Sequence, residues 1–112
     1  MVDADPSPGC PRCGGPLAPL GAGRSCRSCR GVWLSEYRLT EMVRVMRNQL
    51  FGDDLVFTAR AAIEVAPSCP ACAAALTPET FASQPVDRCP AGHGVWLDDG
   101  ELAAALRAVA PA

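Results

Sequence analysis

A four-residue sequence, Gly-Val-Trp-Leu, occurs at positions 31–34 and again 63 residues later at 94–97. Each copy follows a pair of candidate metal ligands, and a Cys-x-x-Cys pair lies upstream across a spacer of 12 residues in the first repeat and 16 in the second. Such self-similarity indicates two copies of one small unit. The upstream pairs are Cys10 with Cys13 and Cys69 with Cys72, and the pairs before the tetrapeptides are Cys26 with Cys29 and Cys89 with His93.

These pairs use all seven cysteines and the single histidine of the 112-residue chain. An odd number of cysteines argues against a disulfide framework. The first nine residues lack the basic and apolar segments of a signal peptide, and no apolar stretch of about 18 residues can span a membrane. We therefore expect a cytoplasmic protein, in which cysteines stay reduced and clustered pairs bind metal.

Structural zinc takes four protein ligands in a tetrahedron, so the eight candidates predict two Zn²⁺ ions. Each Cys-x-x-Cys pair places two sulfur atoms on one tight turn, and Gly14 and Gly31 supply the backbone freedom that such turns need. Site one takes Cys10, Cys13, Cys26 and Cys29, and site two takes Cys69, Cys72, Cys89 and His93.

The last ligand of site two departs from the repeat. When the chain is aligned on the tetrapeptide, Gly92 stands where Cys29 stands, and His93 follows one residue later. An imidazole reaches further than a thiol, so we expect His93 to complete the site. The alternative is that His93 is an exposed loop residue and that site two has three ligands.

Each repeat is near the size below which a hydrophobic core rarely suffices for folding. A structural zinc ion contributes an apparent ~10–16 kcal/mol, compared with a typical net domain stability of ~5–15 kcal/mol. The sequence therefore predicts that a strong chelator unfolds the protein.

A helix is predicted after each tetrapeptide. Ser35 is a good N-cap, the apolar residues from Leu39 to Leu50 follow a three-four spacing, and Gly52 ends the pattern. In the second repeat Asp98 is the expected cap, and Glu101 completes a capping box before a shorter apolar stripe.

The segment between the repeats is ambiguous. It favours either a short helix over 55–62 or two short strands over 55–57 and 63–65, and periodicity does not decide between them.

The motifs in Cys10–Leu17, Cys26–Leu34 and Val86–Leu102 resemble the TFIIB-type zinc-ribbon family, and they do so in two tandem copies. The resemblance implies a small metal-stabilised α+β fold, in which β-hairpin knuckles hold the metal and an α-helix follows each ribbon. It implies the same eight ligands. It also implies a bacterial type of small protein, and it leaves the function open.

The resulting domain organisation has four parts. We expect a flexible N-terminus over 1–9, a first zinc ribbon with its helix over 10–50, a linker over 51–67, and a second ribbon with a short helix over 68–110.

Charge is distributed unevenly between the halves. Residues 1–50 hold seven Arg and four acids, whereas residues 51–112 hold three Arg and eight acids, and the whole chain carries −2. Zinc thiolates make the total more negative, which argues against non-specific affinity for nucleic acid. A local stripe of Arg in the first repeat leaves nucleic acid as a second possibility.

Two apolar features have two interpretations each. Trp33 and Trp96 either pack on their own hairpins and shield the thiolates, which we favour, or form stacking platforms for a nucleobase. The apolar stripe that ends near Phe51 either packs on the second repeat or forms a groove for a partner or a second copy.

We expect a non-catalytic protein-interaction or adaptor module that binds a protein partner or a second copy of itself. Sites with four protein ligands keep no open position for water, so the sequence predicts no enzymatic activity, no catalytic residue and no cofactor besides two Zn²⁺. The alternatives are a nucleic-acid-associated or transcription-related factor that uses the Arg-rich first repeat, and a redox or metal-handling protein. We expect no association with membranes.

Overall fold

The structure is a computed structural model, and it describes residues 9–21, 23–52, 54–61 and 66–111. The predicted N-terminal segment therefore lies outside the described residues except for Gly9. In chain order the elements are β1 (Ala18–Leu20), β2 (Gly23–Ser25), β3 (Val32–Leu34), α1 (Glu36–Met46), β4 (Thr58–Ala59), β5 (Thr77–Phe81), β6 (Gln84–Arg88), β7 (Val95–Leu97) and α2 (Glu101–Val109).

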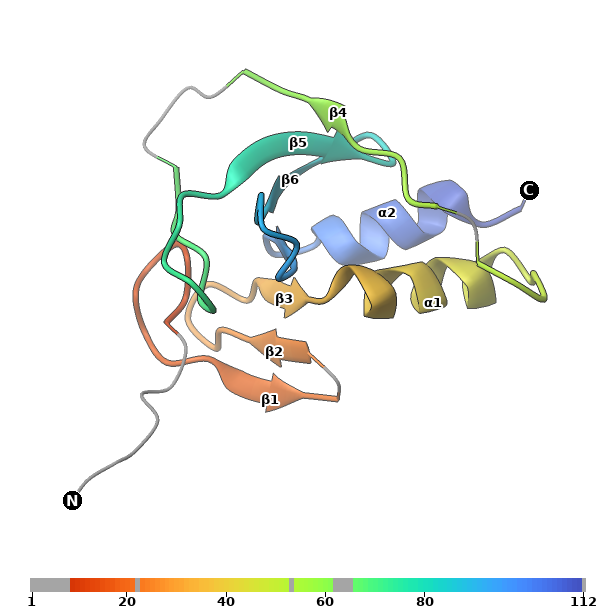
Figure 1. Cartoon of the computed structure of the whole chain (residues 1–112). Helices are drawn as coiled ribbons and strands as arrows, with labels where there is room; N and C mark the ends of the chain where they lie inside the picture. The colour runs from red at the N-terminus through yellow and green to blue at the C-terminus, as the bar shows by residue number, and fades with distance from the viewer. Residues whose placement is uncertain (1–8, 22, 53, 62–65, 112) are drawn as a thin grey trace.

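The seven strands form one antiparallel sheet in the order β1-β2-β3-β7-β6-β5-β4. Helices α1 and α2 lie side by side (Figure 1). The α+β class predicted from the sequence is confirmed, and strands of both repeats belong to the same sheet. The predicted domain boundaries stay a prediction. Neither helix of the described chain has the length and apolar character needed to cross a membrane.

The two repeats are joined by their identical tetrapeptides. Strand β3 pairs with β7 antiparallel, and in this register Trp33 lies directly opposite Trp96. Val32 opposes Leu97 and Leu34 opposes Val95, so the valine of each tetrapeptide lies opposite the leucine of the other. The two copies are thus related by a local two-fold axis between the tryptophans.

The side chains of β3 and β7 alternate between two cores, as strand geometry requires. Trp33 and Trp96 join one buried cluster with Leu17, Leu76 and the buried cysteines. Leu34, Val95 and Leu97 point the other way, into a second cluster with residues of both helices. The sheet therefore separates a metal-binding end from a helical layer.

Helix α1 begins as predicted and ends earlier than predicted. The Ser35 Oγ accepts a hydrogen bond from the Arg38 backbone N–H at 3.0 Å, which confirms Ser35 as the N-cap. The helix stops at Met46, and Asn48 has a left-handed φ of 55°. Gly52 is therefore not the end of the helix. The prediction failed because apolar residues continue past Met46 along a chain that has already turned.

Helix α2 begins at Glu101 without a side-chain cap, so the prediction that Asp98 caps it is wrong. Only half of the capping box forms, since Glu101 Oε1 accepts from the Asp98 backbone N–H at 2.8 Å. The Asp98 carboxylate is occupied elsewhere, by the indole N–H of Trp96 and the guanidinium of Arg12.

The segment between the repeats forms the edge strand β4, which pairs with β5. The helix alternative over 55–62 is wrong for the described part of the segment, and the strand predicted at 55–57 is wrong as well, because these residues are in neither helix nor strand and the strand begins at Thr58. The proposed strand at 63–65 lies outside the described residues. Phe57 anchors the segment, because its ring lies 5.4 Å from that of Phe81 and the Arg88 guanidinium stacks on it at 4.4 Å. A hydrophobic and a cationic side chain thus hold the segment before β4 in place.

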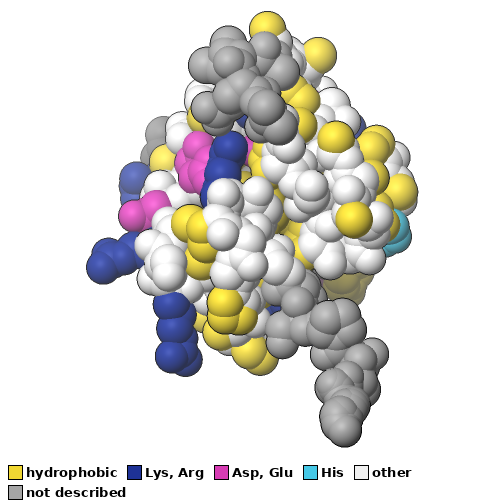
Figure 2. Space-filling model, turned by 90° about the vertical axis from the view of Figure 1, so that its left-hand side faces the viewer, with side chains coloured by type: hydrophobic (Ala, Val, Ile, Leu, Met, Phe, Trp, Pro, Cys, Tyr) yellow, Lys and Arg dark blue, Asp and Glu magenta, His cyan; other side chains and the backbone are white. Residues whose placement is uncertain are grey.

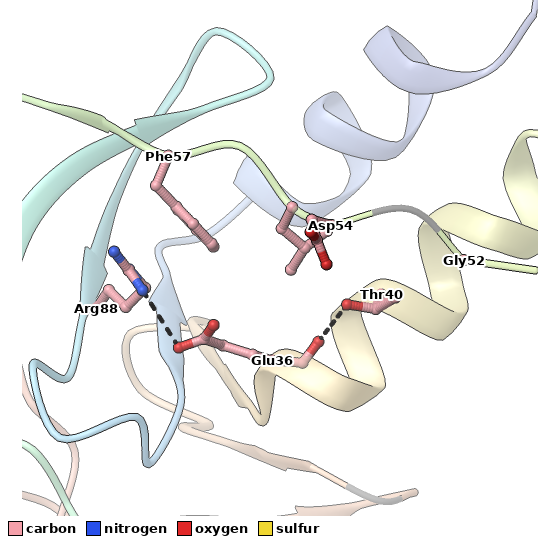
Figure 3. A pocket seen from close by; sticks show the side chains of 7 residues that line it. Glu36, Thr40, Gly52, Asp54, Phe57 and Arg88 are labelled. Atoms are coloured by element: carbon pink, nitrogen blue, oxygen red, sulfur yellow. Dashed lines mark hydrogen bonds and ion pairs between the residues drawn. The ribbon is translucent and has the colours of Figure 1, made fainter.

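A cavity of about 440 Å³ lies between this segment, the start of α1 and Arg88 (Figure 3). Three of its polar side chains are already bonded: Arg88 pairs with Glu36 at 3.5 Å, and the Thr40 hydroxyl donates to the Glu36 carbonyl at 2.9 Å. Glu79 also binds Arg88, and this carboxylate raises the pKa of the guanidinium above its usual value. The cavity therefore offers ligands few unpartnered groups.

Candidate metal centres

The first Cys-x-x-Cys turn has the hydrogen bonds of a metal-binding knuckle. The Cys10 N–H donates to the Gly15 carbonyl at 2.7 Å, and the Gly14 N–H donates to the Cys10 carbonyl at 2.9 Å. Backbone N–H groups also point at the sulfur atoms, from Arg12 to Cys10 and from Gly15 to Cys13, both at 3.4 Å. N–H groups directed at sulfur stabilise the thiolate form that binds metal.

The other three turns repeat this arrangement. The first ligand of each donates its backbone N–H to a carbonyl five residues later, at 2.8–3.1 Å. Three turns have a left-handed residue at the fifth position, and the turn that contains His93 has it one residue earlier. The left-handed residues are Gly14, Arg30, Ala73 and Gly92.

Gly14, with φ of 76°, provides the backbone freedom predicted for it. Gly31 does not, because the left-handed residue of its turn is Arg30. Gly31 is required for space: a Cβ there would lie 2.1 Å from the Trp96 indole.

The four cysteines predicted for site one come together. The sulfur atoms of Cys10, Cys13, Cys26 and Cys29 all lie within 4.8 Å of one another. Cys13 Sγ and Cys26 Sγ are 3.6 Å apart. A tetrahedron with zinc–sulfur bonds of about 2.3 Å has sulfur–sulfur edges of about 3.8 Å, so the spacing suits zinc.

Site two is assembled in the same way from Cys69, Cys72, Cys89 and His93, whose ligand atoms also lie within 4.8 Å. Cys72 Sγ and Cys89 Sγ are 3.8 Å apart, and the His93 Nδ1 is 3.4 Å from Cys89 Sγ. The imidazole therefore compensates for the one-residue offset. Three thiolates and an imidazole are ligands that zinc prefers, so both sets are consistent with zinc.

Within each set one thiol is easier to ionise than the others. The backbone N–H of Cys29 lowers the pKa of Cys26 to about 7. At Cys89 burial favours the neutral thiol, but the backbone N–H groups of His93 and Ala91 outweigh it and lower the pKa to about 6. Without metal, each set thus offers an arriving cation one thiolate near neutral pH.

The remaining shifts favour the protonated thiol. Burial raises the pKa of Cys10, and it raises that of Cys69 to about 11. Hydrogen bonding with the Cys13 thiol raises the pKa of Cys29 to about 12. A bound metal must displace these protons.

Both tryptophans are buried, with 8% of Trp33 and none of Trp96 exposed. The stacking platform for a nucleobase is therefore wrong, and burial is confirmed. The packing partner differs from the one predicted, since each indole crosses to the other repeat. Trp96 covers Gly31, and Trp33 covers Gly94, where a Cβ would lie 2.8 Å from the ring.

An ionic link across the repeats was not predicted from the sequence. The Arg12 guanidinium contacts Asp87 and Asp98 at 2.9 Å each, and Asp98 accepts the Trp96 indole N–H at 2.9 Å. Arg12 belongs to the first knuckle and both acids to the second repeat. The available signal was a difference between the repeats, because Arg12 occupies the variable position of its Cys-x-x-Cys pair where the second pair has Ala71.

Arginine side chains project from one side of the metal-binding end, and the histidine lies on the opposite side (Figure 2). Six of the ten arginines form no ion pair among the residues that the structure describes. These are Arg24, Arg27, Arg30, Arg38, Arg47 and Arg107.

Comparison with known proteins covers part of the chain. Residues 68–108 match the model of the transcription factor zinc-finger family, which describes zinc ribbons of the TFIIB type. No curated protein and no solved structure gave a significant match. The first cysteine set lies outside the matched residues, and it forms a second group that can hold a metal ion. Residues 68–108 are thus one zinc-ribbon domain of the TFIIB type.

Proposed function

We propose that the protein is a non-catalytic, zinc-stabilised interaction module that binds a protein partner. The observation that supports the absence of catalysis is the closed ligand set, because four protein ligands at each site leave no position for water or substrate. The metal ions then act by fixing the fold, and function depends on the surface that the fold presents.

The surface that supports the interaction role lies on the last turn of α1 and in the chain that follows it. The apolar stripe of this helix divides: Leu39 is buried and Met42 and Val43 pack against the helical core. Leu50 and Phe51 project outward with 81% and 78% of their surface exposed. Val45, Met46 and Val56 add further exposed apolar surface in this part of the chain. Apolar surface of this kind is characteristic of interaction sites.

The test is affinity capture from the organism's own extract with the zinc-loaded protein, with and without nuclease. Leu50→Ser combined with Phe51→Ser should abolish capture of the specific partner. Tyr37→Ser is the matched control, because Tyr37 is 76% exposed and lies on the first turn of α1. Equal capture by all three proteins, or by none, contradicts the proposal.

A nucleic-acid-associated function is the second candidate, and one observation favours it. Residues 6–35 contain four arginines and no acid. Loss of all captured partners after nuclease treatment would favour this candidate over the adaptor. A third candidate, redox or metal handling, requires rapid metal exchange or a reversibly reducible iron form, and isotope-labelled zinc exchange measures the first of these.

A further inference from the structure

The two repeats are matched in backbone but not in charge. An offset of 63 residues relates Arg24 to Asp87, Trp33 to Trp96 and Ser35 to Asp98. In the sheet both members of the first pair lie opposite a tryptophan, since Arg24 pairs with Trp33 and Asp87 with Trp96. The equivalent positions on the two sides of the two-fold axis thus carry opposite charges.

In the second repeat these positions form a closed network. The Trp96 indole N–H donates to Asp98 Oδ1 at 2.9 Å, and Arg12 binds both Asp98 and Asp87. Asp87 is buried, with 4% of its surface exposed, and Arg60 contacts it as well at 3.5 Å. Donors and carboxylates are therefore matched within the chain.

In the first repeat the same positions lack an acceptor. Ser35 replaces the aspartate, and its hydroxyl oxygen already accepts from the backbone N–H of Arg38. Within the described ranges, the Trp33 indole N–H has no hydrogen-bond partner and Arg24 has no ion pair. No acid occurs between residues 6 and 35, so the knuckles and strands of this ribbon cannot supply one.

We propose that Arg24 and the Trp33 indole N–H bind a carboxylate from an acidic side chain of the partner protein. A related contact exists in the same molecule, where the Asp98 carboxylate binds the Trp96 indole N–H and a guanidinium together. There the guanidinium comes from Arg12 of the first knuckle, whereas in the first repeat Arg24, directly opposite Trp33 in the sheet, would supply it. A carboxylate is preferred to a nucleic-acid phosphate for two reasons: the second repeat binds a carboxylate with an indole N–H and an arginine, and the net charge of −2 disfavours a polyanion more than a single acidic side chain. The inference rests on the proposed function, for which it names the chemistry of the partner.

The test is a ¹H–¹⁵N NMR titration of the zinc-loaded protein at constant ionic strength. The chain has two tryptophans and so gives two indole signals, which Trp33→Phe assigns. The probes are acetate, inorganic phosphate, and a blocked Gly-Asp-Gly peptide with its Gly-Asn-Gly counterpart. Acetate and the aspartyl peptide should shift the Trp33 signal to saturation and leave the Trp96 signal in place.

Arg24→Gln should weaken this binding by at least about tenfold, since a hydrogen bond to a charged group contributes about that factor. Arg107→Gln, at an exposed position on α2, is the matched control and should bind as the parent does. The titration is repeated with Asp3→Asn and Asp5→Asn combined, so that the carboxylates that precede the described residues cannot compete.

Three results overturn the inference: no saturable shift with acetate or the aspartyl peptide, equal shifts of both indole signals, or tighter binding of phosphate than of the carboxylates. A saturable shift seen only in the Asp3 and Asp5 variant also overturns it, because the chain's own acids then occupy the position. The capture experiment separates this failure from that of the proposed function. Capture that depends on Leu50 and Phe51 but not on Arg24 or Trp33 contradicts this inference alone.

Discussion

At the scale of single residues, the glycine that begins each tetrapeptide leaves room for the tryptophan of the other repeat. The absence of a side chain at Gly31 allows Trp96 to reach across the two-fold axis, and Gly94 does the same for Trp33. The tryptophans are thus structural residues of the junction between the repeats. The sequence predicted their burial, but it assigned each one to its own hairpin because it contains no information on how two copies pair.

Gly31→Ala should destabilise the zinc-loaded protein by about 1–3 kcal/mol, because overpacking a buried contact costs that amount. The measurement is the urea concentration at the unfolding midpoint. Gly9→Ala is the control, since a Cβ at Gly9 has its nearest neighbour at 3.4 Å, an ordinary contact distance. Equal midpoints for the two variants would show that the indole does not press on Gly31.

Arg12 should contribute more to stability than Arg60, although both contact Asp87. Arg12 makes the shorter contact, at 2.9 Å compared with 3.5 Å, and it also binds Asp98. Removing it leaves the buried Asp87 carboxylate less well compensated, so Arg12→Ala should cost about 1–3 kcal/mol of unfolding free energy. Arg60→Ala should cost less and Arg107→Ala close to nothing. A larger loss for Arg60→Ala in urea unfolding would contradict this order.

At the scale of elements, the sequence correctly predicted the features that are determined by contacts between residues close together in the chain. Ser35 caps α1 because nothing competes for its hydroxyl, and the knuckles form because each is a short turn with its own hydrogen bonds. Asp98 failed as a cap because Arg12, 86 residues away, occupies its carboxylate. The segment between the repeats was ambiguous for the same reason, and β4 was not located, since this strand exists by pairing with β5. These elements depend on contacts between residues far apart in the chain, and such contacts could not be predicted from a single sequence.

The cap of α1 gives a prediction at this scale. Ser35→Ala should lower the free energy of unfolding by about 1 kcal/mol, because it removes the acceptor for the Arg38 N–H. Ser35→Asp should retain most of the stability, since aspartate also caps. Thermal unfolding of the zinc-loaded variants measures both, and equal losses for the two would contradict the capping role.

Site one and site two should release metal with different dependence on pH. Lowered pKa values favour the thiolate, and that advantage is lost as pH falls through about 7 for Cys26 and about 6 for Cys89. Site one has two thiols with raised pKa values, Cys10 and Cys29, whose protons a metal must displace, whereas site two has one, Cys69. Metal affinity should therefore decline from a higher pH, and more steeply, at site one. The ligand-field spectrum of bound Co²⁺ distinguishes the two ligand sets, and an identical pH dependence would contradict the assignment.

At the scale of the whole molecule, the buried cysteines of both ligand sets belong to one core. The cluster around Trp33 and Trp96 contains cysteines of both sets, including Cys10, Cys26, Cys69 and Cys89. The grouping of the eight candidate ligands into two sets was predictable, because spacing along the chain places each pair on one turn. The joining of the repeats through β3 and β7 was not, since either tetrapeptide alone looks like the edge of its own ribbon. Loss of one metal should therefore disturb the packing of both repeats.

Stepwise chelation, followed by native mass spectrometry and near-ultraviolet circular dichroism on the same samples, tests this central claim most directly. The account predicts two zinc ions per chain at the start. It predicts that most of the tryptophan signal disappears with the first ion, and that far-ultraviolet ellipticity disappears with the second. A tryptophan signal and secondary structure that persist after confirmed loss of both ions would contradict it, as would a chain that binds fewer than two.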